Sequence, residues 1–402
     1  MDYSYGNATT DNYANTLNYD PVGGNSLGGS FWKFSSASSN VDARLQGKLH
    51  TGALEHNLLI GYSYLDSVYK ADQTAYAPAA VLPTVVMDQL PSTTPGSFTG
   101  VPTSSGLFNW WTEDNAVYAQ DLVTVVPTLK VLLGARYDRI RQHTLVGGSF
   151  ASGVASVDDL TQTYTHTSPR VGLVYQGIPS TSLYGVYSTS FIPNSGMTRS
   201  HENLPPEQGT LKEAGIKYAF SQRLTANVAV FDLTRKNISF CDPTDPNCFY
   251  LIVAGETRSR GVELDLNGQV VERLRLNVAA SFLKAWVAQP DPGGNLTAGN
   301  ELVGAPRRTL NVFGVYSLDR GRRWELGGGV YYASQAQADD ANSFTLPEIL
   351  EIDVMAAYRF APNGRFQLDI KNLTNRHNVA SDGSALTFGQ PLSAYATLHI
   401  GF

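Results

Sequence analysis

The last stretch of the chain, residues 391–402, most constrains the fold because its side chains alternate in character up to the final residue. Counting back in twos from Phe402 gives Ile, Leu and Ala, whereas the intervening positions hold Gly, His, Thr and Tyr. This period of two predicts a β-strand with one apolar face. The strand ends where the chain ends, which fits a sheet that closes on itself and has no unpaired edge. We therefore interpret the stretch as the closing strand of a transmembrane barrel.

The same alternation recurs along the chain in pairs of neighbouring stretches. It is clearest in residues 350–360 and 365–372, where half of the side chains are apolar and half are polar. The expected strands are residues 41–51, 57–69, 116–126, 129–141, 170–175, 182–191, 210–220, 224–238, 259–267, 274–287, 308–316, 323–332, 350–360, 365–372 and 391–402. We therefore expect an all-β, antiparallel transmembrane β-barrel with about 15 strands.

The connections between the expected strands alternate between short and long. Residues 126–128 and 361–364 form short turns, whereas residues 144–166, 291–304 and 375–390 form long loops. Outer-membrane barrels show this asymmetry, with short periplasmic turns and long extracellular loops. Because bacterial single-chain barrels have even strand numbers, the odd count also predicts that further barrel sequence exists.

The amino-acid composition is compatible with a transmembrane barrel and limits the kinds of partner that the chain can bind. The chain has 37 Gly, 21 Tyr, 17 Phe and 5 Trp but only 16% charged residues, which suits a membrane surface edged by aromatic girdles. A soluble β-sandwich or propeller rich in tyrosine is the alternative. The formal charge of -6 argues against a nucleic-acid partner, because no basic stripe replaces phosphate counterions. No apolar run reaches the length of a membrane helix, which leaves spanning by strands open.

Two stretches lack a strand period. Residues 1–40 are rich in Asn, Ser, Gly and Thr and are expected to form a loop with the remnant of a strand, while residues 41–402 form the barrel. The first residues are polar and acidic, so no signal peptide is visible, and an outer-membrane protein would lack its true N-terminus here. Residues 70–112 are expected to form a long loop, and loops of this length are either functional or disordered.

The chain has only two cysteines, Cys241 and Cys248, which enclose two Pro and two Asp residues. A disulfide between them would close a small ring in an oxidising compartment, and free thiols are the alternative. A metal site would need more ligands than this neighbourhood supplies.

Several short stretches occur in a fixed order: TGALEHNLLIGYSY (51–64), AVYAQD (116–121), GARYDR (134–139), SPRVGLVY (168–175), YSTSFIPNSG (187–196), EAGIKY (213–218), VFDLTRKN (230–237), SRGVELD (259–265) and IKNLTNRHNVAS (370–381). Together they resemble the barrel of TonB-dependent ferric-siderophore receptors, closest to the ferrichrome and hydroxamate group. The family often has a Cys pair around an aromatic residue after the VAS element. Here residues 382–384 are Asp, Gly and Ser instead.

The resemblance implies an outer-membrane barrel of about 22 strands, preceded by a signal peptide, a TonB box and a plug domain. Nothing in this chain matches those N-terminal parts, so it is expected to be the C-terminal portion of the barrel, without the plug. The implied function is the uptake of ferric siderophores across the bacterial outer membrane. The TonB–ExbB–ExbD complex would supply energy through the missing part. Iron would arrive already chelated, and no cofactor is expected.

Aromatic residues are the best candidates for ligand contact, because a siderophore chelate is bulky and partly apolar. Phe108, Trp110 and Trp111 form a cluster just before a strand that descends from the outer mouth, and Tyr76 and Phe388 are further candidates. The alternative is that the cluster belongs to the aromatic girdle that faces lipid.

The sequence gives no support for catalysis. Its seven His residues are dispersed, and it has no Cys/His cluster, glycine-rich phosphate loop or nucleophile elbow. We therefore expect a transporter rather than an enzyme, without a metal site of its own.

Arg258 and Arg260 share the parity of the apolar residues Val262 and Leu264, which predicts that they point outward and contact lipopolysaccharide phosphates. A bulge at Gly261 that turns both arginines inward is the alternative. For the whole chain, the alternatives are a passive or structural barrel remnant, a TonB-dependent receptor for another ligand such as cobalamin, and a soluble carbohydrate-binding β protein.

Overall fold

A computed structural model describes residues 2–20, 24–76, 81–82, 102–149, 155–194, 196, 198–200, 202, 204–242, 250–291, 296–381 and 386–401. Every regular element in these ranges is a β-strand, as predicted. Within the described part of the chain, no helix is long and apolar enough to cross a bilayer.

The strands are β1 (Asp2–Asp20), β2 (Gly24–Thr51), β3 (Leu54–Tyr76), β4 (Val81–Leu82), β5 (Pro102–Val126), β6 (Leu129–Ser149), β7 (Ala155–Ile178), β8 (Thr181–Ile192), β9 (Glu207–Ser221), β10 (Leu224–Cys241), β11 (Leu251–Val271), β12 (Leu274–Gln289), β13 (Arg308–Ser317), β14 (Trp324–Ala333), β15 (Ala336–Gln337), β16 (Thr345–Leu346), β17 (Ile349–Ala361), β18 (Gly364–Lys371), β19 (Val379–Ser381), β20 (Leu386–Phe388) and β21 (Ser393–Ile400). Seventeen of them belong to one sheet, while β15 with β16 and β19 with β20 form two small sheets. The pairings with a defined register within these sheets are antiparallel.

The chain divides into two compact units. Unit 1 contains residues 1–47, 59–119 and 135–167, and unit 2 contains residues 48–58, 120–134 and 168–402.

In unit 1, β1 pairs with β2 along its full length, from Asp2 opposite Asp42 to Asp20 opposite Gly24. The prediction of a loop for residues 1–40 is therefore wrong. The backbone groups of residues 2–20 and 24–42 pair as a regular antiparallel ladder. The expected long loop at 70–112 is also shorter than predicted, since β3 extends to Tyr76 and β5 begins at Pro102.

The estimate of about 15 strands is slightly low, and the difference lies in these two regions. The predicted strands all correspond to strands of the large sheet, and the two additional members of that sheet are β1 and β4.

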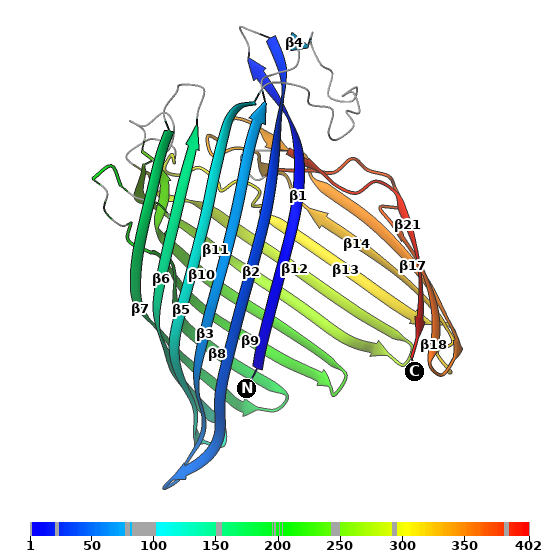
Figure 1. The fold of residues 1–402 in the computed structure, drawn as a ribbon. Helices are drawn as coiled ribbons and strands as arrows, with labels where there is room; N and C mark the ends of the chain where they lie inside the picture. The colour runs from blue at the N-terminus through cyan, green and yellow to red at the C-terminus, as the bar shows by residue number, and fades with distance from the viewer. Residues whose placement is uncertain are drawn as a thin grey trace. The chain divides into compact units, whose positions relative to one another are not determined.

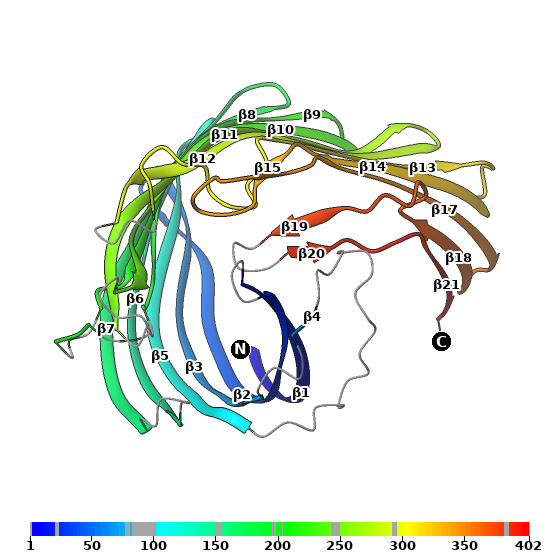
Figure 2. The same ribbon diagram turned by 90° about the horizontal axis from the view of Figure 1, so that it is seen from above.

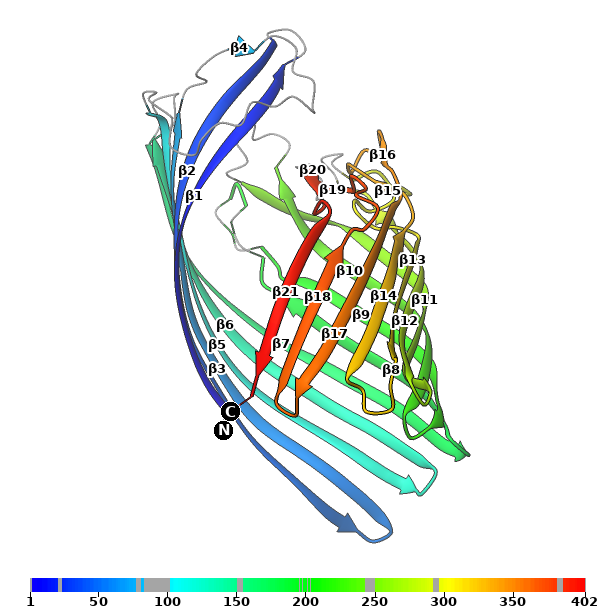
Figure 3. The same ribbon diagram turned by 90° about the vertical axis from the view of Figure 1, so that its right-hand side faces the viewer.

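In unit 2, successive strands from β8 to β14 pair with their neighbours, and β17, β18 and β21 continue the series (Figure 1). Short turns join the hairpins at one end, and the longer connections that carry β15, β16, β19 and β20 lie at the other (Figure 3). Seen from above, β15, β19 and β20 lie to one side of β13, β14 and β17 (Figure 2).

The turn end of unit 2 repeats one hydrogen bond. In each case the carbonyl of the residue before a strand accepts from an amide at the end of the strand that comes next in the sheet, at N–O distances between 2.7 and 2.9 Å. The accepting residues are Thr128, Ser180, Arg223, Arg273, Arg323 and Asn363. This repeat fixes the register between neighbouring hairpins, because a shift by one residue would leave these groups unpaired.

Alternate side chains of the unit 2 strands face opposite sides of the sheet. Val230, Val262 and Phe282 lie opposite one another on β10, β11 and β12, and they are 51%, 40% and 61% exposed. Such an exposed apolar face is expected where strands contact lipid. We call this the apolar face.

The other side of these strands, the polar face, buries charged groups among long side chains. Glu325 is only 5% exposed and pairs with Arg275 at 3.0 Å and with Arg365 at 3.3 Å. Asp353, 3% exposed, accepts from the Lys371 ammonium at 2.6 Å. Burial of these carboxylates is tolerated because each has a cationic partner.

Candidate functional site

Three aromatic rings form a row on one face of unit 1. The ring centroids are 5.9 Å apart between Phe34 of β2 and Tyr69 of β3, and 5.3 Å apart between Tyr69 and Trp110 of β5. Trp110 occupies an even position of β5, like Tyr118, whose hydroxyl donates to Asp42 Oδ2 at 2.9 Å. The aromatic row therefore lies on the polar face of these strands, which lines the interior of a transmembrane barrel.

Trp111 follows Trp110 in the chain but belongs to the opposite face. Its ring stacks on His143 of β6, with centroids 4.7 Å apart and an angle of 20° between the planes. His143 Nε2 in turn lies 2.5 Å from Asp159 Oδ1. Trp111 shares its parity with the exposed Val117, so it is positioned as the girdle alternative requires.

The other predicted contact residues are scattered. Phe108 lies on β5 and Tyr76 is the last residue of β3. Phe388 ends β20 and is 64% exposed. Cys241 ends β10, whereas Cys248 lies outside the described residues, so the disulfide stays a prediction.

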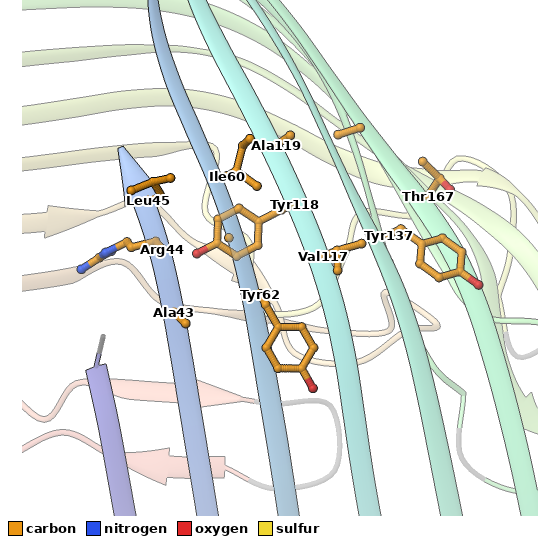
Figure 4. Close-up of a pocket in the computed structure, with 12 residues that line it drawn as sticks. Ala43, Arg44, Leu45, Ile60, Tyr62, Val117, Tyr118, Ala119, Tyr137 and Thr167 are labelled. Atoms are coloured by element: carbon orange, nitrogen blue, oxygen red, sulfur yellow. The ribbon is translucent and has the colours of Figure 1, made fainter. Parts of the chain in front are cut away.

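An open apolar groove of about 720 Å³ crosses the strands of unit 1 (Figure 4). It is lined by Ala43, Arg44, Leu45, Ile60, Gly61, Tyr62, Val117, Tyr118, Ala119, Ala135, Tyr137 and Thr167. Most of these side chains are apolar, so the groove is suited to hydrocarbon rather than to a charged chelate.

A basic cluster lies on the apolar face of unit 2, formed by Arg258, Arg260 and Lys284 around Asp232 and Trp286. Arg258 donates two hydrogen bonds to the Asp232 carboxylate, at 2.8 and 2.6 Å, and Arg260 donates one at 2.8 Å. The Lys284 ammonium and the Arg260 guanidinium lie 5.1 and 5.9 Å from the centre of the Trp286 ring. A single carboxylate thus holds two of the three cations in place.

The bulge alternative for this cluster is wrong. The register of β11 with both β10 and β12 is continuous across Gly261, so the period of two is not interrupted. Arg258 and Arg260 therefore keep the parity of the exposed Val262.

At the long-loop end of unit 2, side chains and backbone join the connection after β12 to the connection after β14. The Asn342 amide nitrogen donates to the Glu301 carbonyl at 2.9 Å, and its oxygen accepts from the Glu301 amide at 2.8 Å. The Gly304 amide donates to the Gln337 carbonyl at 3.0 Å. These bonds give two irregular segments a defined relative position.

A pocket of about 680 Å³, the loop pocket, lies between these two connections and the ends of β13 and β14. It is lined by Glu301, Arg307, Arg308, Tyr332, Ser334, Gln335, Ala336, Gln337, Thr345, Pro347 and Glu348. Its volume falls within the range of small-molecule sites. The loop pocket is not predictable from periodicity, because its residues come from loops. An excess of charged and amide residues next to strand ends is the only signal in the sequence.

One ion pair crosses the loop pocket. Arg307 Nε donates to Glu301 Oε1 at 2.7 Å, and the nearby carboxylate raises the pKa of the Arg307 guanidinium. The Glu301 carboxylate thus neutralises the charge of Arg307. Within the described residues, no group of three or more His, Cys, Asp or Glu side chains is placed to hold a metal ion.

Comparison with known sequences identifies similar proteins among bacterial receptors. The chain is 30% identical over 352 residues to the metal-pseudopaline receptor CntO of Pseudomonas aeruginosa, covering 83% of this chain and 46% of that protein. It is 27% identical to the ferrioxamine B receptor of Salmonella typhimurium, covering 86% and 47% of the two chains. The chain therefore spans about half the length of the curated relatives that it matches.

Solved structures share the fold. The siderophore receptor PiuA from Acinetobacter baumannii matches with a TM-score of 0.74 and 18% identity, over 99% of this chain and 64% of that one. The ferric preacinetobactin receptor BauA from the same organism matches with a TM-score of 0.75 and 20% identity, over 99% and 59%. These matches confirm the predicted transmembrane barrel fold.

The sequence profile of one family, described as "TonB dependent receptor-like, beta-barrel", matches residues 1–373. This family is made up of receptors and transporters of the bacterial outer membrane, which confirms the predicted location. The strands, the exposed apolar face and this match lead to one conclusion: the chain belongs to the TonB-dependent receptor β-barrel family.

Proposed function

We propose that this chain is the barrel part of an outer-membrane receptor that takes up metal chelates of the siderophore class, with energy supplied through TonB. The observation that carries the proposal is the family match over residues 1–373. The named functions of the relatives support it, because they include receptors for metal-pseudopaline, ferrioxamine B and ferrichrome. The proposal includes no catalytic step, and iron is cargo rather than a cofactor.

The aromatic row is the proposed contact surface for the chelate. Phe34, Tyr69 and Trp110 present ring faces on the polar side of their strands, where a ligand in the interior would pass. Trp111 is assigned to lipid contact instead. The groove in unit 1 has the apolar lining that a lipid chain requires, and we assign it to outer-membrane lipid.

Tryptophan fluorescence tests this assignment directly. The purified chain, folded in detergent, would be titrated with ferric ferrioxamine B and with ferrichrome. Trp110→Ala should abolish the ligand-induced change in fluorescence, whereas Trp111→Ala, one residue away on the opposite face, should retain it. Equal responses of the two variants would contradict the proposed contact surface.

We also assign the basic cluster to lipopolysaccharide. Arg258, Arg260 and Lys284 lie beside an exposed apolar band, and phosphates are the anions available at that depth of the outer leaflet. Lipopolysaccharide phosphate that copurifies with the protein should fall in the double variant Arg258→Glu/Arg260→Glu. The matched control is Arg320→Glu/Arg322→Glu at the turn end, and an equal content in both proteins would overturn the assignment.

A further inference from the structure

Three arginines lie next to one another at the turn end of unit 2, on the neighbouring strands β14, β17 and β18 (Figure 3). Arg323 immediately precedes β14, and its carbonyl accepts from the Arg359 amide of β17 at 2.8 Å. Arg359 lies directly opposite Arg365 of β18, and Arg365 lies directly opposite His399 of β21. We call Arg323, Arg359 and Arg365 the arginine row.

The arginine row belongs to the polar face of these strands. Arg323 is two residues from Glu325, and Arg359 is two residues from Ala357; Glu325 is 5% exposed and Ala357 is 3% exposed. The residue after Arg323, Trp324, is 51% exposed and lies on the apolar face. The row therefore faces away from lipid, which excludes a lipid headgroup as its partner.

The nearby carboxylates of the described residues are engaged elsewhere. Glu325 is shared between Arg275 at 3.0 Å and Arg365 at 3.3 Å. Asp319 accepts from a backbone amide of its own turn at 2.9 Å. Asp369 accepts from the side-chain amide two residues before it, at 2.9 and 2.8 Å. Glu325 is thus the one carboxylate among these three that pairs with an arginine.

The arginine row carries an excess of positive charge. Like charges at directly opposite positions of neighbouring strands destabilise a sheet, and Arg359 has an arginine at such a position on both sides. Within the described part of the chain, Arg323 and Arg359 form no ion pair, whereas Arg365 shares its carboxylate with Arg275. An anion that lies along the row would remove this repulsion, because each guanidinium offers a fork of donors to an oxyanion.

The length of the arginine row decides which kind of anion fits. Neighbouring strands lie about 4.8 Å apart, so the row together with His399 crosses four strands and extends over about 14 Å. A single phosphate or carboxylate contacts one or two guanidinium groups. An extended polypeptide instead presents side chains to one face about every 6.7 Å, so alternate acidic residues can reach the whole row.

We propose that the arginine row binds an acidic polypeptide segment that lies across the strand ends at the turn end of unit 2. Short turns of an outer-membrane barrel lie on the periplasmic side, so the partner is a periplasmic segment with several carboxylates on one face. The inference goes beyond the proposed uptake function and does not depend on which chelate the barrel takes up.

Fluorescence anisotropy with the whole chain, folded in non-ionic detergent at low salt, tests the site. The probes are hexaglutamate and hexaglutamine peptides that carry the same uncharged dye. Hexaglutamate should bind at least about tenfold more tightly than hexaglutamine, because its carboxylates form charge-assisted bonds. Binding should be lost in 1 M NaCl, where the screening length is about 3 Å. Equal affinities of the two peptides would overturn the proposal.

Variants of single arginines locate the site. Arg359→Gln and Arg323→Gln should each weaken hexaglutamate binding about tenfold. The matched control is Arg223→Gln, which makes the same change of charge at the turn end of another hairpin, where Arg223 donates to Gln269 at 3.4 Å. It should retain the affinity of the unmodified chain. An equal loss in all three variants would show attraction to the whole turn end and would overturn the row as a site.

Two further measurements exclude other causes. Because Arg359→Gln removes repulsion, this variant should unfold at the same or a higher denaturant concentration than the unmodified chain, so its weaker binding would not reflect unfolding. Tripolyphosphate and unlabelled hexaglutamate should both displace the labelled peptide, with hexaglutamate effective at the lower concentration. The reverse order would overturn a polypeptide as the partner and assign the row to a phosphate anion.

Discussion

The two ends of unit 2 are stabilised in different ways. At the turn end, one backbone hydrogen bond repeats from hairpin to hairpin, and the accepting residues are as different as Thr128, Arg223 and Asn363. At the loop end, the connections are held by particular side chains, above all Asn342, whose amide reaches both Glu301 and Asp339. A backbone hydrogen-bond ladder therefore tolerates almost any side chain, whereas the loop end depends on individual residues.

The largest effect is expected at the turn end, at a position where the side chain does matter. Gly268 has a φ of 137°, and a Cβ there would lie 1.9 Å from the carbonyl oxygen of Arg223. Gly268→Ala should therefore lower the free energy of unfolding by about 3 kcal/mol, measured by denaturant unfolding in detergent.

The matched control for this prediction is Gly47→Ala. Gly47 also lies in a strand, but a Cβ added there would have no other atom within 4 Å, and its φ is ordinary. Gly47→Ala should leave stability unchanged within about 0.5 kcal/mol. Similar losses in both variants would mean that the close approach to Arg223 is not what constrains the turn.

The second largest effect is expected at the loop end, without a change in the backbone hydrogen bonds between the strands. Asn342→Ala removes the bonds to Glu301 and introduces a side chain that disfavours the φ of 54° at this position. Opening of the connection after β12 should become easier by about 2 kcal/mol. Hydrogen exchange at the Glu301 amide measures this change.

Asn342→Gly separates the two causes, because glycine accepts the positive φ but cannot form the side-chain bonds. We expect it to recover part of the loss. An unchanged exchange rate at Glu301 in Asn342→Ala would show that the loop end does not depend on this side chain.

The sequence predicted the regular strands and their short turns well. The period of two and the short turns identified the strands from residue 41 onward, because the lipid-facing side chains must be apolar. It failed for β1 (Asp2–Asp20), because its many Asn, Thr, Ser and Gly residues indicate a loop and only backbone pairing reveals the strand. The same limit hid the loop pocket, whose frame depends on contacts such as Asn342 with Glu301 across 41 residues of sequence.

The position at which β5 begins decides whether Trp110 and Trp111 belong to one site. Because residues 70–112 were expected to form a loop, the period of two was not applied to Trp110 and Trp111, and both were treated as one candidate site. With β5 beginning at Pro102, the two neighbours fall on opposite faces of the strand. Strand boundaries, rather than residue types, limited the prediction of the site.

A smaller effect is the dependence of the loop end on pH. The Ser343 hydroxyl and amide, together with the Asn342 amide, hold the pKa of Asp339 below its usual value. Because the folded pKa is the lower one, this contribution is present above the unfolded pKa of about 3.9 and is lost as pH falls through the folded pKa. The protection factor of the Ser343 amide should therefore decrease at acidic pH.

Asp339→Asn is the control for this effect, since it cannot titrate. Its Ser343 protection factor should be independent of pH over the same range, while amides of the turn end should remain protected in both proteins. A loss of protection at the turn end at the same pH would indicate global unfolding rather than loop opening.

The smallest expected effect concerns β5 of unit 1, where side chains alternate between two faces, and it involves no change in stability. In liposomes that contain brominated lipids, Trp111 should be quenched because it lies on the same face of β5 as the exposed Val117, whereas Trp110 belongs to the aromatic row on the opposite face. Trp111→Phe should therefore remove more of the bromine-dependent quenching than Trp110→Phe. Acrylamide, a water-soluble quencher, should give the reverse order. The same order with both quenchers would mean that β5 does not keep its period of two at this point, and the assignment of Trp110 to the chelate would fail with it.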